Sequence, residues 1–283
     1  MAITPPRMPN GNLIKERIGV YGPPDAGKTH MFFTLAKWHH DLGSKARFYG
    51  INTDTSWDVL YCNPEFSELP NIEWTEVLYF QEYIDAAKKY HKMLTPEDWL
   101  SVDLMPMGWS ATQNEYARIL TKSKSGKKLE DVGDLWEQTG VLDEYPIKGW
   151  DWGMPNARYQ SLANNYILMG PGHRFLMYGE KKLLKESESG RTKEADEVTE
   201  IFGHVGYKPD GQKDDPFRYH TFLRVQGIYG KNGKRAHKVT TAKERWGNRR
   251  RLGVTMQNNH TRGEKMEDFF LEYLVGVAGW QMS

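Results

Sequence analysis

The sequence predicts an α/β fold in which helices flank a central, mainly parallel sheet. Short apolar segments alternate with longer segments whose apolar residues recur at helical spacing, which is the order that builds parallel sheets. The segment at 99–105 is apolar almost throughout, as expected of a strand buried on both faces. A glycine-containing turn joins the first apolar segment directly to the first helical one. These features indicate one layered domain.

The first half of the chain supplies most of the expected sheet. An irregular arm at 1–15 precedes strands at 17–21, 46–51, 72–80 and 99–105 and helices at 28–42, 81–94 and 110–121. The first helix has Met31, Phe32, Leu35 and Ala36 at helical spacing, which gives it an apolar side to place against the sheet.

The second half is expected to hold two long polar loops, at 122–156 and 181–216. A helix at 157–169 and a strand at 174–178 lie between them, and strands at 218–228 and 236–241 flank Asn232-Gly233, a pair that favours a hairpin turn. Helical spacing predicts a last helix at 264–277. The expected organisation is an arm (1–15), a core (16–260) and a C-terminal helix packed on it (261–283).

The composition is that of an ordinary globular protein, with 39% hydrophobic and 27% charged residues among 283. The net charge of +1 argues neither for nor against a nucleic-acid partner. Cys62 is the only cysteine, which excludes a disulfide within the chain and a cysteine-based metal cluster. No apolar stretch reaches the length of about 18 residues that spans a membrane, so we expect a cytoplasmic protein.

The turn after the first strand carries the strongest chemical signal. Gly22, Gly27, Lys28 and Thr29 fit the P-loop pattern G-x-x-x-x-G-K-[ST], whose backbone N–H groups curl around phosphates at a helix amino end. The four variable positions of the loop are Pro23, Pro24, Asp25 and Ala26. Lys28 is expected to reach the β- and γ-phosphates and Thr29 to hold Mg²⁺. The sequence therefore predicts a nucleoside triphosphate site, with ATP as the default.

Two acidic residues that follow apolar strands are candidates for the chemistry on that triphosphate. Asp103, about 75 residues after the loop, suits the carboxylate that orders the metal and its water. Asp54 suits a general base that orients the attacking water. The same Asp54, in N-T-D-T, suits a helix cap or turn equally well, and both interpretations stay open.

The order GPPDAGKT, INTD, WLSVDLM and RFLMYGEKK, over residues 16–245, resembles the ATPase core of the RecA family, especially the compact RecA-like nucleotide-binding proteins of phages. The resemblance implies a RecA-like P-loop fold with Asp103 as the Walker B acid. Asp54 stands where the family keeps its catalytic carboxylate, usually Glu. Glu180 falls where the family has a polar γ-phosphate sensor, commonly Gln.

The resemblance also implies an assembly of identical subunits, as a ring or filament, with the nucleotide between neighbours. Lys243 and Arg245 match the basic residues that the family presents to the nucleotide of the neighbouring subunit. Their charge would stabilise the transition state there, as an arginine finger does. The implied activity is ATP hydrolysis in phage recombination, annealing or replication, with single-stranded DNA as partner and the host cytoplasm as location.

Local clusters of cations support a nucleic-acid partner. Residues 231–251 hold nine Lys or Arg against one acid, Glu244, a density that suits phosphate contacts. The segment 122–156 adds lysines and tryptophans suited to phosphate pairing and base stacking. The candidate residues are Lys122, Lys124, Lys127, Lys128, Trp150, Trp152, Arg249, Arg250 and Arg251.

Three alternatives remain from the sequence. A packaging or translocation motor would share the same core but needs a partner or nuclease domain, which is not visible here. A small-molecule kinase would have a substrate lid rich in Arg, whereas 122–156 has none. A nucleotide-stabilised assembly protein with little turnover fits the departures at Asp54 and Glu180 from the residues usual in the family.

Overall fold

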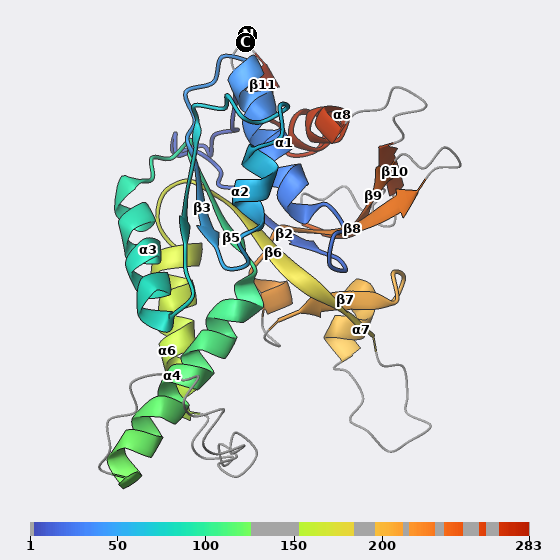
Figure 1. The fold of residues 1–283 in the computed structure, drawn as a ribbon. Helices are drawn as coiled ribbons and strands as arrows, with labels where there is room; N and C mark the ends of the chain where they lie inside the picture. Colours follow the sequence, from blue (N-terminus) through green and yellow to red (C-terminus); the bar gives the residue numbers. More distant parts are fainter. Residues whose placement is uncertain are drawn as a thin grey trace.

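The computed structural model describes residues 3–125, 153–183, 196–211, 215–229, 235–245, 255–258 and 266–282. Within these ranges the α/β prediction is confirmed, because a mainly parallel sheet lies at the centre with helices on both faces (Figure 1). The strand order is β10-β9-β8-β2-β6-β5-β3-β4, and β7 pairs with β6 outside that path.

Six strands run parallel and define the two ends of the sheet. They are β2 (Arg17–Tyr21), β3 (Phe48–Asn52), β4 (Ile72–Glu76), β5 (Trp99–Asp103), β6 (His173–Lys182) and β8 (Thr221–Tyr229). The antiparallel strands are β7 (Tyr207–Asp210), β9 (Arg235–Glu244) and β10 (Thr255–Asn258). The carboxyl ends of the six parallel strands therefore meet along one side of the molecule, which we call the carboxyl edge.

Two apolar cores hold the helices on the sheet. On one face lie α1 (Lys28–Asp41), α2 (Ser56–Tyr61), α8 (Met266–Phe270) and its continuation η4 (Leu271–Val275). On the other lie α3 (Phe80–Met93), α4 (Met105–Ser125), α6 (Gly153–Leu162), η1 (Ala163–Leu168) and α7 (Asp196–Phe202). Along β5, Trp99 enters the first core and Leu100 the second, as the alternation of side chains in a strand requires. All five residues of β5 are buried, as the sequence predicts.

Helix α4 begins earlier than the sequence suggests, at Met105 rather than near residue 110. Pro106 is tolerated because the first turn of a helix leaves its N–H groups unpaired in any case. Gly108 allows close packing on α3, since a Cβ there would lie 2.8 Å from the Tyr83 ring. The helix also runs to Ser125, so Lys122 and Lys124 belong to its last turns and not to a loop.

The segment expected as a second loop, 181–216, contains regular structure. Strand β6 continues to Lys182, β7 pairs with it, and α7 lies between the two. The short 3-10 turn η2 (Asp215–Phe217) follows. The polar composition hid these elements because β7 has one buried residue and α7 few apolar ones.

The two ends of the described chain lie together. Strand β1 (Ile3–Thr4) pairs antiparallel with β11 (Gln281–Met282). The buried carboxylate of Glu16 accepts hydrogen bonds from the Tyr273 hydroxyl and the Trp280 indole, both at 3.2 Å. These bonds join the C-terminal segment to Glu16, and the pairing of β1 with β11 joins it to the start of the chain. None of the described helices is long and apolar enough to span a bilayer.

Candidate functional site

The loop at Gly22–Thr29 leaves β2 at the carboxyl edge and leads into α1. Asp25 and Gly27 adopt left-handed φ values of 57° and 95°, which fold the loop back on itself. Position 22 requires glycine for a different reason, since a Cβ there would lie 2.1 Å from the Val225 carbonyl oxygen. Neither a side-chain cap nor an acid in the first turn occupies the amino end of α1. Its N–H groups are therefore available to an anion.

Lys28 lies across this loop. Its side chain is buried, and the ammonium donates hydrogen bonds to the carbonyl oxygens of Gly22 (3.2 Å) and Pro23 (2.9 Å). Burial lowers the pKa of Lys28, while the nearby carboxylates of Asp103 and Asp54 oppose that shift. These carbonyl oxygens carry only a partial negative charge. A phosphate at the helix end would give the buried ammonium a partner with a full negative charge.

Asp103, at the end of β5, reaches the first turn of α1. Its Oδ2 accepts a hydrogen bond from the Thr29 hydroxyl at 2.6 Å and another from the Trp57 indole at 3.1 Å. The carboxyl group is fully buried, which raises the pKa of Asp103 to about 6. The charge of Asp54 raises it further, whereas Thr29, Trp57 and Lys28 act in the opposite direction. The fold thus brings together two residues that are 74 positions apart in the sequence.

These oxygens form a donor set that suits Mg²⁺. Magnesium binds oxygen atoms and usually takes only one or two protein ligands, completing its shell with water and phosphate. Thr29 and Asp103 would supply two such ligands, and no cluster of three or more His, Cys, Asp or Glu occurs among the described residues. Asn52, the register partner of Asp103, adds a buried Nδ2 that has no hydrogen-bond partner in the described part of the chain. Such an unpaired donor suits a site that receives an anion.

Asp54 lies at the same edge in an exposed turn before α2. Its Oδ1 accepts the Ser56 N–H at 3.1 Å, as expected of the turn interpretation. The influence of its charge on both Lys28 and Asp103 shows that it also lies within electrostatic reach of the loop. The two interpretations of Asp54 are therefore compatible in this geometry.

Glu180, the candidate sensor, lies next to the loop but is held by another residue. The Arg224 guanidinium binds its carboxylate in a bidentate pair, with distances of 2.8 and 3.2 Å, and neither side chain is exposed. The guanidinium also lies 4.0 Å above the ring of Tyr207. Sequence reasoning missed Arg224, since nothing local in β8 marks it as a partner for β6.

This ion pair gives a first prediction. Replacing Arg224 by Met should lower the free energy of unfolding by about 3 kcal/mol, because it leaves the largely covered Glu180 carboxylate without its partner. The double variant Arg224→Met/Glu180→Leu should recover most of that loss, since neither charge then remains. Urea unfolding of the two variants and of wild type measures both values. A double variant no more stable than the single one would contradict this account of the pair.

Lys243 and Arg245 lie at the opposite end of the sheet from the loop. Lys243 pairs with Phe222 and Thr221 pairs with Ile18, near the start of β2. Lys243 is buried and Arg245 is exposed. Burial, followed by the charges of Arg17, Arg245 and Lys243, lowers the pKa of His220 to about 4, so cations gather at this end. The geometry does not bring these two residues to the loop of their own chain.

The nucleic-acid candidates can be followed only in part. Lys122 and Lys124 stand near the carboxyl end of α4. Lys127, Lys128, Trp150, Trp152, Arg249, Arg250 and Arg251 lie outside the described residues.

A further residue at the loop, His237 of β9, was not anticipated. Its Nδ1 lies 2.9 Å from the Ala26 carbonyl oxygen, and a Cβ at Gly27 would lie 2.2 Å from its ring. The ring also stacks on that of His30 in α1, with 5.2 Å between centroids. No sequence signal could have found this contact, which joins positions 211 residues apart.

Comparison of the chain with protein-family models and with curated proteins finds no match.

Proposed function

We propose that the chain is a RecA-like P-loop ATPase that binds ATP with Mg²⁺ at the Gly22–Thr29 loop and hydrolyses it. The observation that carries the proposal is the hydrogen bond between Thr29 and the buried Asp103. It puts two metal-ligating oxygens beside the uncapped amino end of α1, where Lys28 lies across the loop. Mg²⁺ would be held by Thr29 and Asp103, and when bound it neutralises charge on the phosphate oxygens.

The remaining residues of the proposed site bind the phosphates or orient the attacking water, according to their charge and position. The N–H groups at the start of α1 and the Lys28 ammonium bind and orient the β- and γ-phosphates. Asp54, with an exposed carboxylate at the same edge, orients the attacking water and accepts its proton. The Glu180–Arg224 pair borders the site and fixes the end of β6 against β8.

We further propose that the protein assembles head to tail as a ring or filament and acts on single-stranded DNA. A head-to-tail contact brings the end of the sheet that carries Arg245 toward the carboxyl edge of the next subunit. Arg245 is exposed and can enter a neighbour's site, whereas Lys243 would have to leave a buried position to do so. The basic residues of the sequence supply the charge for the DNA phosphates.

Two observations support a second candidate, a nucleotide-stabilised assembly protein with little turnover. The Glu180 carboxylate is occupied by Arg224, and Asp54 accepts the Ser56 N–H. Both groups must give up or share a hydrogen bond before they act on a γ-phosphate or its water. Slow hydrolysis with tight binding would follow if they do not.

Hydrolysis of ATP by wild type and by Asp54→Ala, each with and without single-stranded DNA, separates these functions. DNA should raise the wild-type rate, and Asp54→Ala should lower it about 100-fold or more, as expected for loss of a general base. The matched control is Asp85→Ala, which changes an exposed acid on a different element, α3, and should keep the full rate. An equally active Asp54→Ala would remove its catalytic role. Tight ATP binding with a slow, DNA-independent rate would favour the second candidate.

A further inference from the structure

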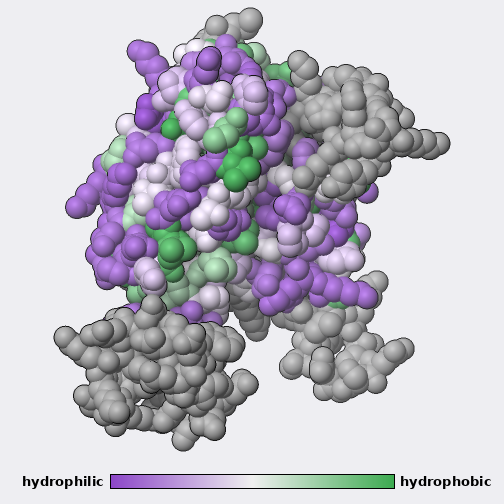
Figure 2. Space-filling view, in the orientation of Figure 1, coloured by the Kyte–Doolittle hydropathy of each residue, from purple (hydrophilic) through white to green (hydrophobic). Residues whose placement is uncertain are grey.

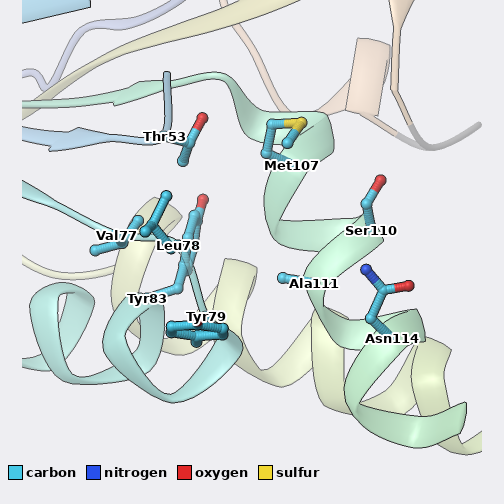
Figure 3. Close-up of a pocket in the computed structure, with 9 residues that line it drawn as sticks. All are labelled: Thr53, Val77, Leu78, Tyr79, Tyr83, Met107, Ser110, Ala111 and Asn114. Carbon is cyan, nitrogen blue, oxygen red and sulfur yellow. The ribbon is translucent and has the colours of Figure 1, made fainter. Parts of the chain in front are cut away.

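A pocket of about 120 Å³ opens at the carboxyl edge next to the proposed nucleotide site. Thr53 at the end of β3 forms one wall, and the turn of Val77, Leu78 and Tyr79 between β4 and α3 forms another. The first turns of α4 close the third side with Met107 and its neighbours. Figure 3 shows these side chains grouped around the opening.

Most of the side chains that line the walls are apolar, and several of these are exposed. Leu78 is 73% exposed, Tyr79 56% and Met107 46%. The space-filling view shows hydrophobic surface between α3 and the start of α4 (Figure 2). Apolar side chains gathered around a hollow mark a surface that receives a ligand.

The chemistry of the pocket suits a nucleobase. The Tyr79 ring offers an aromatic face of the kind on which the bases of single strands stack. Asn114 adds an exposed carboxamide, which both donates and accepts and can pair with the edge of a base. An apolar side chain of a partner protein, in contrast, would make no hydrogen bond with that amide, so a base fits the pocket better.

The direction of α4 favours a base that belongs to a strand. Ser110 and Asn114 line the pocket from one face of the helix, and the same four-residue spacing continues to the positions of Arg118 and Lys122. Each step of four residues advances about 6 Å along the helix. Two cationic positions therefore follow the pocket along an inclined row on the helix surface, as needed to accompany a phosphate backbone.

The pocket is connected to the nucleotide site through Thr53. Its hydroxyl and its N–H both donate to the Asp103 carbonyl oxygen, at 2.6 and 2.7 Å. The Leu104 N–H donates in turn to the Thr53 hydroxyl at 2.8 Å. The carboxylate of the same Asp103 accepts the Thr29 hydroxyl, so a nucleic acid that displaces Thr53 would also move a residue that we propose to hold Mg²⁺. Helix α4, which carries the opposite wall, starts two residues after Asp103.

We propose that this pocket receives one base of a single-stranded nucleic acid and thereby couples strand binding to Asp103. The inference rests on the proposed function, in which single-stranded DNA acts on the hydrolysis of ATP. It adds the place where the strand is bound and the contact that transmits its binding.

The test uses the full chain, a non-hydrolysable ATP analogue with Mg²⁺, and a short oligonucleotide that carries one fluorescent 2-aminopurine. In wild type, stacking on Tyr79 should quench the fluorescence. Tyr79→Ala should abolish the quenching and weaken binding about tenfold or more, as expected for loss of one stacked base. Tyr79→Phe keeps the ring and should behave as wild type. Val59→Ala, at an exposed apolar position on α2, is the matched control and should also bind as wild type.

Folding is not expected to confuse the result, because Glu82 fixes the turn through the N–H groups of Leu78 and Tyr79, which Tyr79→Ala retains. Unchanged binding and quenching in a DNA-stimulated Tyr79→Ala would overturn the pocket inference alone. If wild type neither binds the oligonucleotide nor responds to it, the proposed nucleic-acid function fails as well. Self-association of wild type that Tyr79→Ala abolishes, with oligonucleotide binding intact, would assign the pocket to a second copy and overturn the inference.

Discussion

Lys28→Ala should weaken the binding of ATP with Mg²⁺ and reduce hydrolysis by about 100-fold or more, the size expected when a preorganised charge is removed from a phosphate site. The ammonium is buried and points into the loop, where it donates to two carbonyl oxygens of the loop itself. Calorimetric titration with a non-hydrolysable analogue measures the binding loss, and steady-state assays measure the rate.

A second lysine of α1 provides the control for this prediction. Lys37 lies on the same helix and pairs with Asp41. Such partly exposed i,i+4 pairs contribute less than about 1 kcal/mol, so Lys37→Ala should bind ATP as wild type does. Burial lowers the pKa of Lys28, which means that the loop by itself holds the charged ammonium at some cost. Lys28→Ala should therefore melt close to wild type without nucleotide, and a large drop would point to misfolding instead.

Asp103→Asn should abolish metal-dependent hydrolysis and yet make the nucleotide-free protein more stable at pH 8. The carboxyl group has a folded pKa of about 6 against about 4 in an unfolded chain, chiefly because it is buried. Ionising it in the fold therefore costs up to about 3 kcal/mol. Asparagine avoids this cost and can still accept from Thr29 or Trp57.

The pH dependence of this effect has a fixed sign. Below about pH 4 the carboxyl group is protonated in both states, so the two proteins should have nearly equal stability. Between about pH 4 and 6 only the folded state keeps the proton, so wild type loses stability as the pH rises and Asp103→Asn does not. Above pH 6 the difference is constant. Urea unfolding at pH 4, 6 and 8 measures it, and a variant that is less stable at pH 8 would refute the argument.

The corresponding substitution of an aspartate by asparagine at the other end of β5 should lower the stability instead of raising it. Asp98, just before the strand, is buried but accepts the backbone N–H groups of Arg47 and Thr95, both at 2.7 Å. Asp98→Asn weakens two charge-assisted hydrogen bonds and should cost about 1–2 kcal/mol. Stability without activity at Asp103, and activity with reduced stability at Asp98, would distinguish a functional from a structural carboxylate.

The sequence predicts those parts of the site that local pattern encodes. The loop at Gly22–Thr29 joins a strand to a helix within a dozen residues, and Asp103 ends an apolar strand. Since parallel strands share a carboxyl edge, these two signals suffice to place Asp103 near Thr29. The strand positions of the first half follow from the same kind of signal, with ends displaced by a few residues.

The rest depends on contacts between distant segments. The Arg224 side chain could have faced water on β8, and only the pairing of β8 with β2 brings it beside Glu180. His237 likewise meets the loop because the paired strands β8 and β9 continue past the end of β2. The early start of α4 was missed because Gly108 disfavours a helix by itself, while its packing on Tyr83 requires a small residue there.

The contact between His237 and Gly27 couples the position of the loop to that of β9. At 2.2 Å from an added Cβ, the ring fills the space that any side chain at position 27 would need, and its nitrogen holds the Ala26 carbonyl. A ligand that moves Ala26 or Gly27 toward β9 would therefore push on His237. A force applied to β8 and β9 by a neighbouring molecule would therefore reach the loop, through His237 at Gly27 and through Val225 at Gly22.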